Sequence, residues 1–165
     1  MRTPNRKPGK FAFIKLDPHL TPAKFNELKV HLDHLKKVTL PRAVQEAKSL
    51  AEMGDFSENF GYSIAKGNLR RINARILALE EQLNHAVIIK PNKQKIVGLG
   101  SKITVSINGE RQTFQILGSS ETNPDQGIIS HNSPLGSALM GRSEGESVKI
   151  LHLGNDIVCT IIKIE

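Results

Sequence analysis

The chain has 165 residues, enough for one domain or two small ones, and it carries a net charge of +7 with a pI of about 9.7. This basic balance favours an acidic partner such as nucleic acid. Cys159 is the single cysteine, which excludes a disulfide framework and a cysteine-based metal centre and fits a reducing compartment. No apolar run has the length of a signal-peptide core or a membrane span, so we expect a cytoplasmic protein with no membrane partner.

The positive charge is concentrated in the first two thirds of the chain. Residues 1–20 hold five Lys or Arg and one Asp among several prolines, which predicts a basic flexible arm. Residues 21–96 hold thirteen cations and eight acids, whereas residues 97–165 hold five and seven. A cationic binding surface is therefore expected before residue 97 and not after it.

Two long amphipathic helices are predicted after the arm. Thr21-Pro22 is a good helix start, with Thr as N-cap and Pro at the first helical position. The apolar seam of the first helix is Phe25, Leu28, Leu32 and Leu35, and it resumes with Val44, Ala47 and Ala51. Pro41 interrupts this seam and predicts a kink or a local irregularity. Gly54 ends the helix.

The second helix has a regular seam over three heptads, formed by Tyr62, Ala65, Leu69, Ile72, Ile76, Leu79 and Leu83. Two such seams joined by a short turn predict an antiparallel coiled-coil hairpin over residues 21–89, with its tip at residues 54–62. Each arm of the hairpin would be about 45 Å long at 1.5 Å per residue. The length of such a rod suggests that its far end is used.

The C-terminal part is predicted to be a small β-rich domain. Residues 90–96 read as a polar linker, and residues 97–165 as the globular domain. Asn108-Gly109 predicts a tight hairpin between two strands, and a second hairpin is expected around Gly154-Asn155. Ser133-Pro134 predicts a short helix that Gly141 ends. An antiparallel sheet with one short helix gives an α+β fold.

Asp55 and Glu58 are the charged residues of the hairpin tip, three positions apart. If the second helix starts near Asp55, both carboxylates lie on one face. One interpretation is structural, because acids in a first helical turn accept bonds from free amides and suit the helix dipole. The residues around the pair decide whether capping is their whole role.

Two motifs resemble those of a known family. Gly54-Asp55-x-x-Glu58-Asn59-x-x-Tyr62, at the tip of a coiled coil, resembles the bacterial Gre transcript-cleavage factors, GreA and GreB. Residues 129–141 resemble the matching segment of their FKBP-like C-terminal domain. The resemblance covers about residues 20–165 with both parts in the right order. Phe56-Ser57 and the Arg-rich second helix are nearer the GreB branch than the GreA branch.

The resemblance implies an accessory factor of bacterial RNA polymerase and not an independent enzyme. The hairpin would enter the secondary channel, and Asp55 and Glu58 would help to hold Mg²⁺ and to position water. The polymerase would then cleave its own backtracked RNA near the 3′ end. Two-metal phosphodiester hydrolysis needs oxygen ligands of this kind. Two carboxylates bind Mg²⁺ weakly, so we expect no metal on the free protein, which should be a monomer.

Further residues have two interpretations each. Lys66, Arg70, Arg71 and Arg75 form either a solvated helix surface or, as in the family, a basic patch that binds RNA phosphates. Ser133 and Pro134 cap a helix, and in the family the matching loop docks on the polymerase. His31 and His34 are expected to be exposed polar residues without a metal, and Cys159 a small core residue.

Two other functions remain open at this point. The first is a regulator that occupies the same channel and inhibits polymerase without cleavage. The second is a self-sufficient metal-dependent hydrolase, which would need more ligands than two acids at an exposed tip offer. Phe56 is larger and more apolar than the residue usual in the family, and the N-terminal arm has no counterpart there. Neither feature has an explanation in the sequence.

Overall fold

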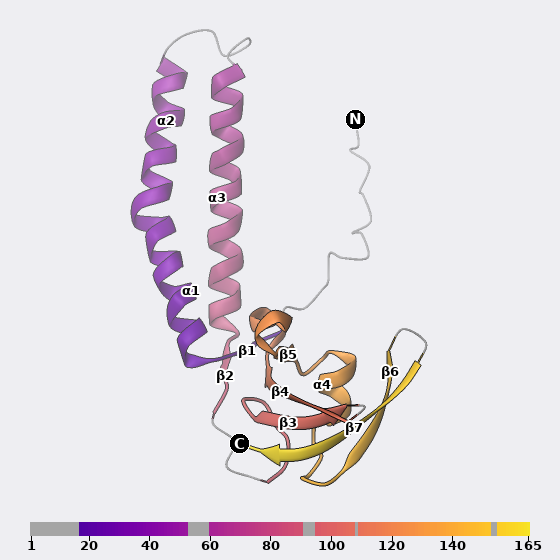
Figure 1. Ribbon diagram of the computed structural model, residues 1–165. Coiled ribbons are helices and arrows are strands. Elements are labelled where there is room, and N and C mark those ends of the chain that lie inside the picture. Colours follow the sequence, from indigo (N-terminus) through magenta and orange to yellow (C-terminus); the bar gives the residue numbers. More distant parts are fainter. Residues whose placement is uncertain (1–16, 53–59, 91–94, 108, 153–154) are drawn as a thin grey trace, which may run out of the picture.

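The fold consists of a long helical hairpin standing on a small curled sheet (Figure 1). The computed structural model describes residues 17–52, 60–90, 95–107, 109–152 and 155–165. The first arm of the hairpin contains α1 (Pro22–His34), a π-helical segment (Leu35–Thr39) and α2 (Leu40–Glu52), and the second arm is α3 (Phe60–Asn84). The predicted α+β class, with a hairpin followed by a β domain, is confirmed.

The predicted start of α1 and both predicted seams are largely confirmed. The Thr21 side chain accepts a hydrogen bond from the backbone N–H of Lys24 at 3.1 Å, and Pro22 occupies the first helical position. Buried or half-buried seam residues face each other along the two arms, from Phe25 to Leu35 on one arm and from Tyr62 to Leu83 on the other. Ala65, Ile76 and Leu79 are the most deeply buried of them. Packing of these apolar faces stabilises the hairpin.

The predicted irregularity at Pro41 takes the form of a π-turn just before it. The N–H of Leu40 bonds to the carbonyl of Leu35, five residues back. Proline lacks an N–H and its ring clashes with the carbonyl four residues earlier in a regular α-helix, so a widened turn at this place relieves a real conflict. The irregularity is therefore local to residues 35–39, and the helix continues beyond it.

The π-turn also changes which residues of α2 face the seam. Val44, which the sequence pattern placed in the seam, is 46% exposed, and Ala43 is buried in its place. This part of the prediction is wrong because the π-turn inserts one extra residue per turn and shifts the phase of the helix that follows. The buried side of the first arm consequently continues at spacings of four residues, through Leu35, Thr39 and Ala43.

The globular domain is a five-stranded sheet in the order β5-β4-β3-β7-β6. Its strands are β3 (Lys102–Ile107), β4 (Glu110–Leu117), β5 (Ile128–Ser130), β6 (Ser147–His152) and β7 (Asn155–Ile164). Both predicted hairpins, β3–β4 and β6–β7, are confirmed as antiparallel pairs. The sheet is mixed and not wholly antiparallel, because β5 runs parallel to β4. Two 3-10 turns, at Ser119–Glu121 and Pro124–Gln126, carry the chain back for this parallel pairing.

The core of this domain lies between the sheet and the short helix α4 (Pro134–Leu139). Ile103, Val105, Ile116 and Ile161 of the sheet are fully or almost fully buried in it, with Leu139 of α4. Cys159 is fully buried in the same cluster, as predicted, and burial raises the pKa of its thiol. A raised pKa keeps the thiol protonated and chemically inert.

A two-stranded parallel sheet joins the start of the hairpin to its end. It pairs β1 (His19–Leu20) with β2 (Val87–Ile88), directly before α1 and after α3. Leu20 is fully buried against Leu28 and Leu79. The sequence reading assigned residues 17–20 to the flexible arm, but the fold uses them as the base of the hairpin.

The base of the hairpin is hydrogen-bonded to the segment that follows β4. The Glu121 carboxylate accepts from both the N–H and the hydroxyl of Thr21, each at 2.6 Å. The N–H of Ser119 donates to the Asp17 carboxylate at 2.6 Å. The Gln82 side chain of α3 reaches the Ser120 hydroxyl at 3.2 Å. These bonds connect both arms of the hairpin to the globular domain.

Gly118 allows the two parts to approach so closely. Its backbone has ordinary dihedral angles, φ −68° and ψ 158°, so backbone conformation does not require glycine here. A Cβ at this position would lie 2.0 Å from the carbonyl oxygen of His19. The lack of a side chain is therefore what lets the backbone of β1 pass over residue 118.

Asp17 lies at the centre of this junction. Its side chain is 5% exposed, and it accepts hydrogen bonds from the backbone N–H groups of His19 and Ser119. Burial by itself raises the pKa of the carboxyl, but these bonds outweigh it and lower the pKa from 3.8 to about 2. Asp17 is thus ionised, and its negative charge is stabilised by the fold.

We predict opposite effects from two glycine substitutions. Gly118→Ala should destabilise the protein by about 1–3 kcal/mol, since the new methyl group meets the His19 backbone. Gly67→Ala, inside α3 with open space around it, should stabilise the protein by about 0.5–1 kcal/mol. Urea unfolding measures both changes. A neutral effect of Gly118→Ala would show that the junction can open without loss of stability.

We predict that Asp17→Asn lowers the free energy of unfolding by about 2 kcal/mol at neutral pH. Because the folded pKa is the lower one, this stabilisation is present above pH 3.8 and is lost as the pH falls toward 2. The variant should therefore show a smaller fall in stability between pH 4 and pH 2 than the wild type. Asp125→Asn, at an exposed carboxylate, is the matched control. Equal acid profiles for the wild type and Asp17→Asn would contradict the assignment.

Candidate functional site

The end of α2 and the start of α3 lie at the end of the hairpin farthest from the sheet (Figure 1). α2 ends at Glu52 and α3 begins at Phe60, so the chain between them contains both tip carboxylates. Asp55 and Glu58 themselves lie outside the described residues. What the fold establishes is their position along the chain, between the distal ends of two antiparallel helices.

The first turn of α3 exposes two apolar side chains beside the tip. Phe60 is 78% exposed and Ile64, one turn later, is 50% exposed. The sequence pattern assigned neither residue a role, because both lie outside the apolar seam of α3. Tyr62 of the seam is half-buried, and the ammonium of Lys66 lies 5.8 Å from the centroid of its ring. This cation–π contact holds Lys66 close to the tip.

The four cations predicted as one patch lie on two flanks of α3. All four side chains are exposed. Lys66 and Arg70 are four residues apart and share one flank, as do Arg71 and Arg75. The two pairs are separated by about 140° around the helix axis, because five residues at 3.6 per turn give that rotation. They therefore act on two different sides of the hairpin.

Arg71 and Arg75 line a groove between the two arms of the hairpin. The groove has a volume of about 350 Å³, and its other lining residues are Leu35, Asn68 and Ile72. The Arg71 guanidinium donates a hydrogen bond to the side chain of Asn68, which also lines the groove. Guanidinium groups in such a groove present planar sets of donors to phosphate oxygens.

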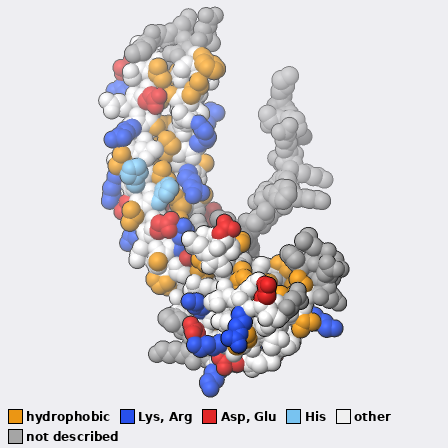
Figure 2. Space-filling model, viewed as in Figure 1, with side chains coloured by type: hydrophobic (Ala, Val, Ile, Leu, Met, Phe, Trp, Pro, Cys, Tyr) orange, Lys and Arg blue, Asp and Glu red, His pale blue; other side chains and the backbone are white. Residues whose placement is uncertain are grey.

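A second hollow of about 250 Å³ continues the groove toward the tip and shares Asn68 and Ile72 with it. Arg42 and Glu46 of α2 line this hollow, together with Val38 and Thr39 of the π-segment. Sequence reasoning missed Arg42, although Pro41 next to it signalled an irregular turn. Figure 2 shows Lys and Arg side chains spread along the viewed face of the hairpin. The groove and the hollow together are lined by three arginines and one acid.

Ser133 and Pro134 hold the start of α4, as predicted. The Ser133 hydroxyl accepts from the N–H of Gly136 at 3.0 Å and donates to the carbonyl of Ser130 at 2.7 Å. Pro134 is exposed at the first helical position. A Cβ on Gly136 would lie 2.1 Å from the Ser130 carbonyl oxygen, so α4 packs directly on the end of β5. The structural role of Ser133 is therefore established by its contacts, while Pro134 is free to meet a partner.

His31 and His34 are both exposed on α1, as expected. A group of possible metal ligands lies elsewhere, at the junction, where Asp17, His19 and His131 come together. Sequence reasoning missed it because His131 is more than a hundred residues away from the other two. Asp17-x-His19 was the local signal. Among the described helices, none has the length and apolar character that crossing a membrane requires.

Comparison with known proteins identifies both parts of the chain. Residues 19–88 match the family described as "Transcription elongation factor, N-terminal", and residues 91–165 match "Transcription elongation factor, GreA/GreB, C-term". The chain is 36% identical to transcription elongation factor GreA of Macrococcus caseolyticus, over 88% of this chain and 94% of the relative. It is 34% identical to GreA of Geobacillus kaustophilus, over 84% and 90%.

Among solved structures, the chain is similar to GreA factor homolog 1 of Thermus thermophilus. The identity is 29%, the match covers 90% of this chain and 99% of that one, and the TM-score is 0.42. The two curated relatives named above are GreA proteins, which favours the GreA branch over the GreB branch that Phe56-Ser57 suggested. On the two family matches and these identities, the chain belongs to the GreA/GreB family of transcription elongation factors, and it is an accessory factor and not itself an enzyme.

Proposed function

We propose that this protein binds bacterial RNA polymerase in the cytoplasm, as a monomer, through the polymerase's secondary channel. There it stimulates the polymerase's own cleavage of backtracked RNA. The observation that carries the proposal is the place of Asp55 and Glu58 in the chain. They fall in the chain between α2 and α3, whose facing ends lie at the end of the hairpin away from the sheet (Figure 1).

In this proposal the tip supplies oxygen ligands that the polymerase lacks. Asp55 and Glu58 share one Mg²⁺ with the polymerase and orient the attacking water. The free protein binds this ion too weakly to retain it, because Mg²⁺ keeps most of its waters when only two carboxylates are offered. Metal binding and cleavage are therefore expected only in the complex.

The groove side of the hairpin is proposed to bind the extruded RNA 3′ segment. Arg71 and Arg75 line the groove, and Arg42 lies in the adjoining hollow on the same side. Lys66 and Arg70 lie exposed on the other flank, away from this groove. Phosphate contacts of this kind give affinity without reading sequence.

Ser133 and Pro134 are proposed to dock on the rim of the channel. Pro134 is exposed, and the cap hydrogen bonds of Ser133 fix the backbone around it. The hydrogen bonds between Thr21 and Glu121 join the globular domain, which carries this loop, to the base of the hairpin. A contact at the rim would thereby help to set where the tip arrives.

We predict that neutralising either tip acid abolishes stimulation but leaves binding intact. End-labelled RNA in a stalled, backtracked elongation complex should yield short 3′ fragments with the wild-type protein. Asp55→Asn and Glu58→Gln should each lower the cleavage rate at least about tenfold, since each removes a ligand from a weak site. Glu52→Gln, at the exposed end of α2, is the matched control and should cleave normally.

Three results would contradict the proposal. Wild-type rates with both tip variants would show that the acids serve only as helix caps. Bound protein with slowed synthesis and no fragments would identify a channel-occupying inhibitor. RNA cleavage by the protein in the absence of polymerase would identify a hydrolase.

We predict that the two basic flanks differ in their effect on RNA. The double variant Arg71→Gln/Arg75→Gln should require more factor for half-maximal cleavage. A plot of log affinity against log salt concentration should have a slope that is shallower by about 1.4. This is the change expected when two phosphate contacts to a single strand are lost. Lys66→Gln/Arg70→Gln removes the same charge from the other flank and should change the slope less. A larger effect of the second pair would place the RNA on the opposite side of the hairpin.

A further inference from the structure

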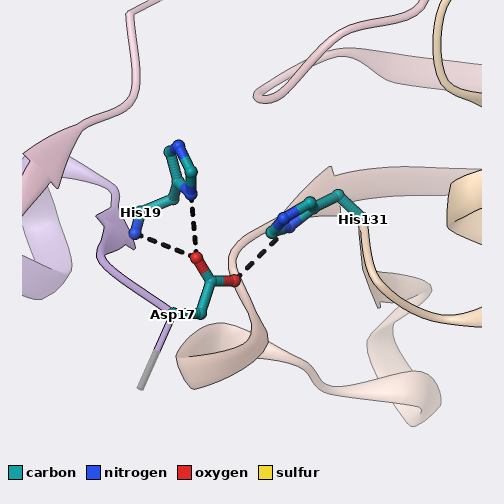
Figure 3. A group of neighbouring side chains, drawn as sticks. All are labelled: Asp17, His19 and His131. Carbon is teal, nitrogen blue, oxygen red and sulfur yellow. Dashed lines mark hydrogen bonds and ion pairs between the residues drawn. The ribbon is translucent and has the colours of Figure 1, made fainter. Parts of the chain in front are cut away.

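Three potential metal ligands meet at the junction between the hairpin and the globular domain (Figure 3). Asp17 lies two residues before His19, the first residue of β1, and His131 directly follows β5. One ligand atom from each lies within 4.8 Å of the others. This group is far from the tip, and it uses chain segments that the proposed function does not assign.

The distances between these atoms are close to those of a tetrahedral metal site. His19 Nδ1 lies 2.8 Å from Asp17 Oδ1, and His131 Nδ1 lies 3.4 Å from Asp17 Oδ2. Zn²⁺ with ligands at 2.0–2.1 Å would place them about 3.3 Å apart. The two imidazole rings stand edge to face, with centroids 5.3 Å apart at 79°, so both rings reach the same carboxylate without overlapping.

The carboxylate is already oriented by groups outside the candidate site. The N–H of His19 donates to Oδ1 at 3.1 Å, and the N–H of Ser119 donates to Oδ2 at 2.6 Å. Figure 3 shows the two imidazoles at different oxygens of this carboxylate, His19 at Oδ1 and His131 at Oδ2. Fixed second-shell bonds of this kind are what hold the ligands of natural metal sites in place.

The donor set selects the class of metal. Two imidazole nitrogens and one carboxylate suit Zn²⁺ and neighbouring transition metals, whereas Mg²⁺ prefers oxygen ligands alone. The carboxylate is 5% exposed, while His19 is 32% and His131 18% exposed, so water can reach the nitrogen side and fill a fourth position. Binding would replace the proton between His19 Nδ1 and the carboxylate, and His131 Nδ1, which also lies 3.4 Å from the carbonyl of Leu117, would turn to the ion.

We propose that Asp17, His19 and His131 form a structural binding site for a transition-metal ion, with Zn²⁺ as the fitting member. The ion would connect the start of the hairpin to the loop that precedes α4. It would thus hold the hairpin base on the globular domain in addition to the hydrogen bonds already present. Because the unfolded chain does not bring these residues together, binding would also raise the unfolding temperature.

The test uses the full-length protein, stripped of metal by a chelator and titrated with Zn²⁺ in a calorimeter. We expect one Zn²⁺ per chain. His19→Gln and His131→Gln should each weaken binding at least about tenfold. The matched control is the double variant His31→Gln/His34→Gln, which removes two exposed histidines from α1 and should bind normally. Mg²⁺ in excess should not displace the ion.

A second measurement needs no variant. Co²⁺ bound to the wild-type protein should give the intense visible absorption of a tetrahedral site, and Zn²⁺ should remove it. Thermal unfolding should shift upward by several degrees with Zn²⁺ for the wild type and for the α1 control, but not for His19→Gln. Circular dichroism establishes that each variant is folded.

Several outcomes would overturn the proposal. Absence of saturable Zn²⁺ binding to the wild type would show that the three residues form a hydrogen-bonded lock alone. Binding that is lost in the α1 double variant and kept in His19→Gln and His131→Gln would place the ion on the hairpin. Displacement by Mg²⁺ would point to an oxygen-rich site elsewhere in the chain.

Discussion

The close passage of β1 over Gly118 is the constraint on which the arrangement of the two parts depends. The His19 carbonyl lies where a side chain at residue 118 would begin, so the hairpin base and the turn after β4 can only meet with glycine at that position. Once they meet, Thr21 reaches Glu121 and Ser119 reaches Asp17. A polar linker alone would leave the hairpin free to reorient. The backbone contact instead gives the rod a defined direction relative to the sheet.

The first arm of the hairpin also has to accommodate a proline, Pro41, within its length. Pro41 cannot continue a regular helix, and the π-turn at Leu35–Thr39 accommodates it without ending the rod. The same turn shifts the seam to Ala43 and leaves Arg42 at the hollow beside Asn68. A local backbone adjustment thereby places a cation on the side that Arg71 and Arg75 already occupy. The π-turn thus affects both the packing of the seam and the position of Arg42.

The hairpin tip, the rod and the junction thus have separate roles in the molecule. The proposed chemistry lies at the end of a rod, the cations lie along it, and the globular domain carries little positive charge. The junction at Asp17 is separate from both, and it is where the protein stabilises its own geometry. Substitutions there should alter stability and orientation, whereas substitutions at the tip should alter cleavage.

The sequence by itself determined the helical hairpin, both β-hairpins, the caps at Thr21 and Ser133, and the buried thiol, because short-range spacing and turn chemistry specify all of these. It also determined the family, through two motifs at a set distance. Only the tertiary structure decided that β5 pairs parallel with β4 and that Leu20 closes the hairpin base. It likewise brought Arg42 to the side of the hairpin that Arg71 and Arg75 occupy, and it joined His131 to Asp17 and His19. The reason is that these features depend on contacts between distant segments, which no local pattern encodes, and on the phase of a helix, which a single π-turn changes.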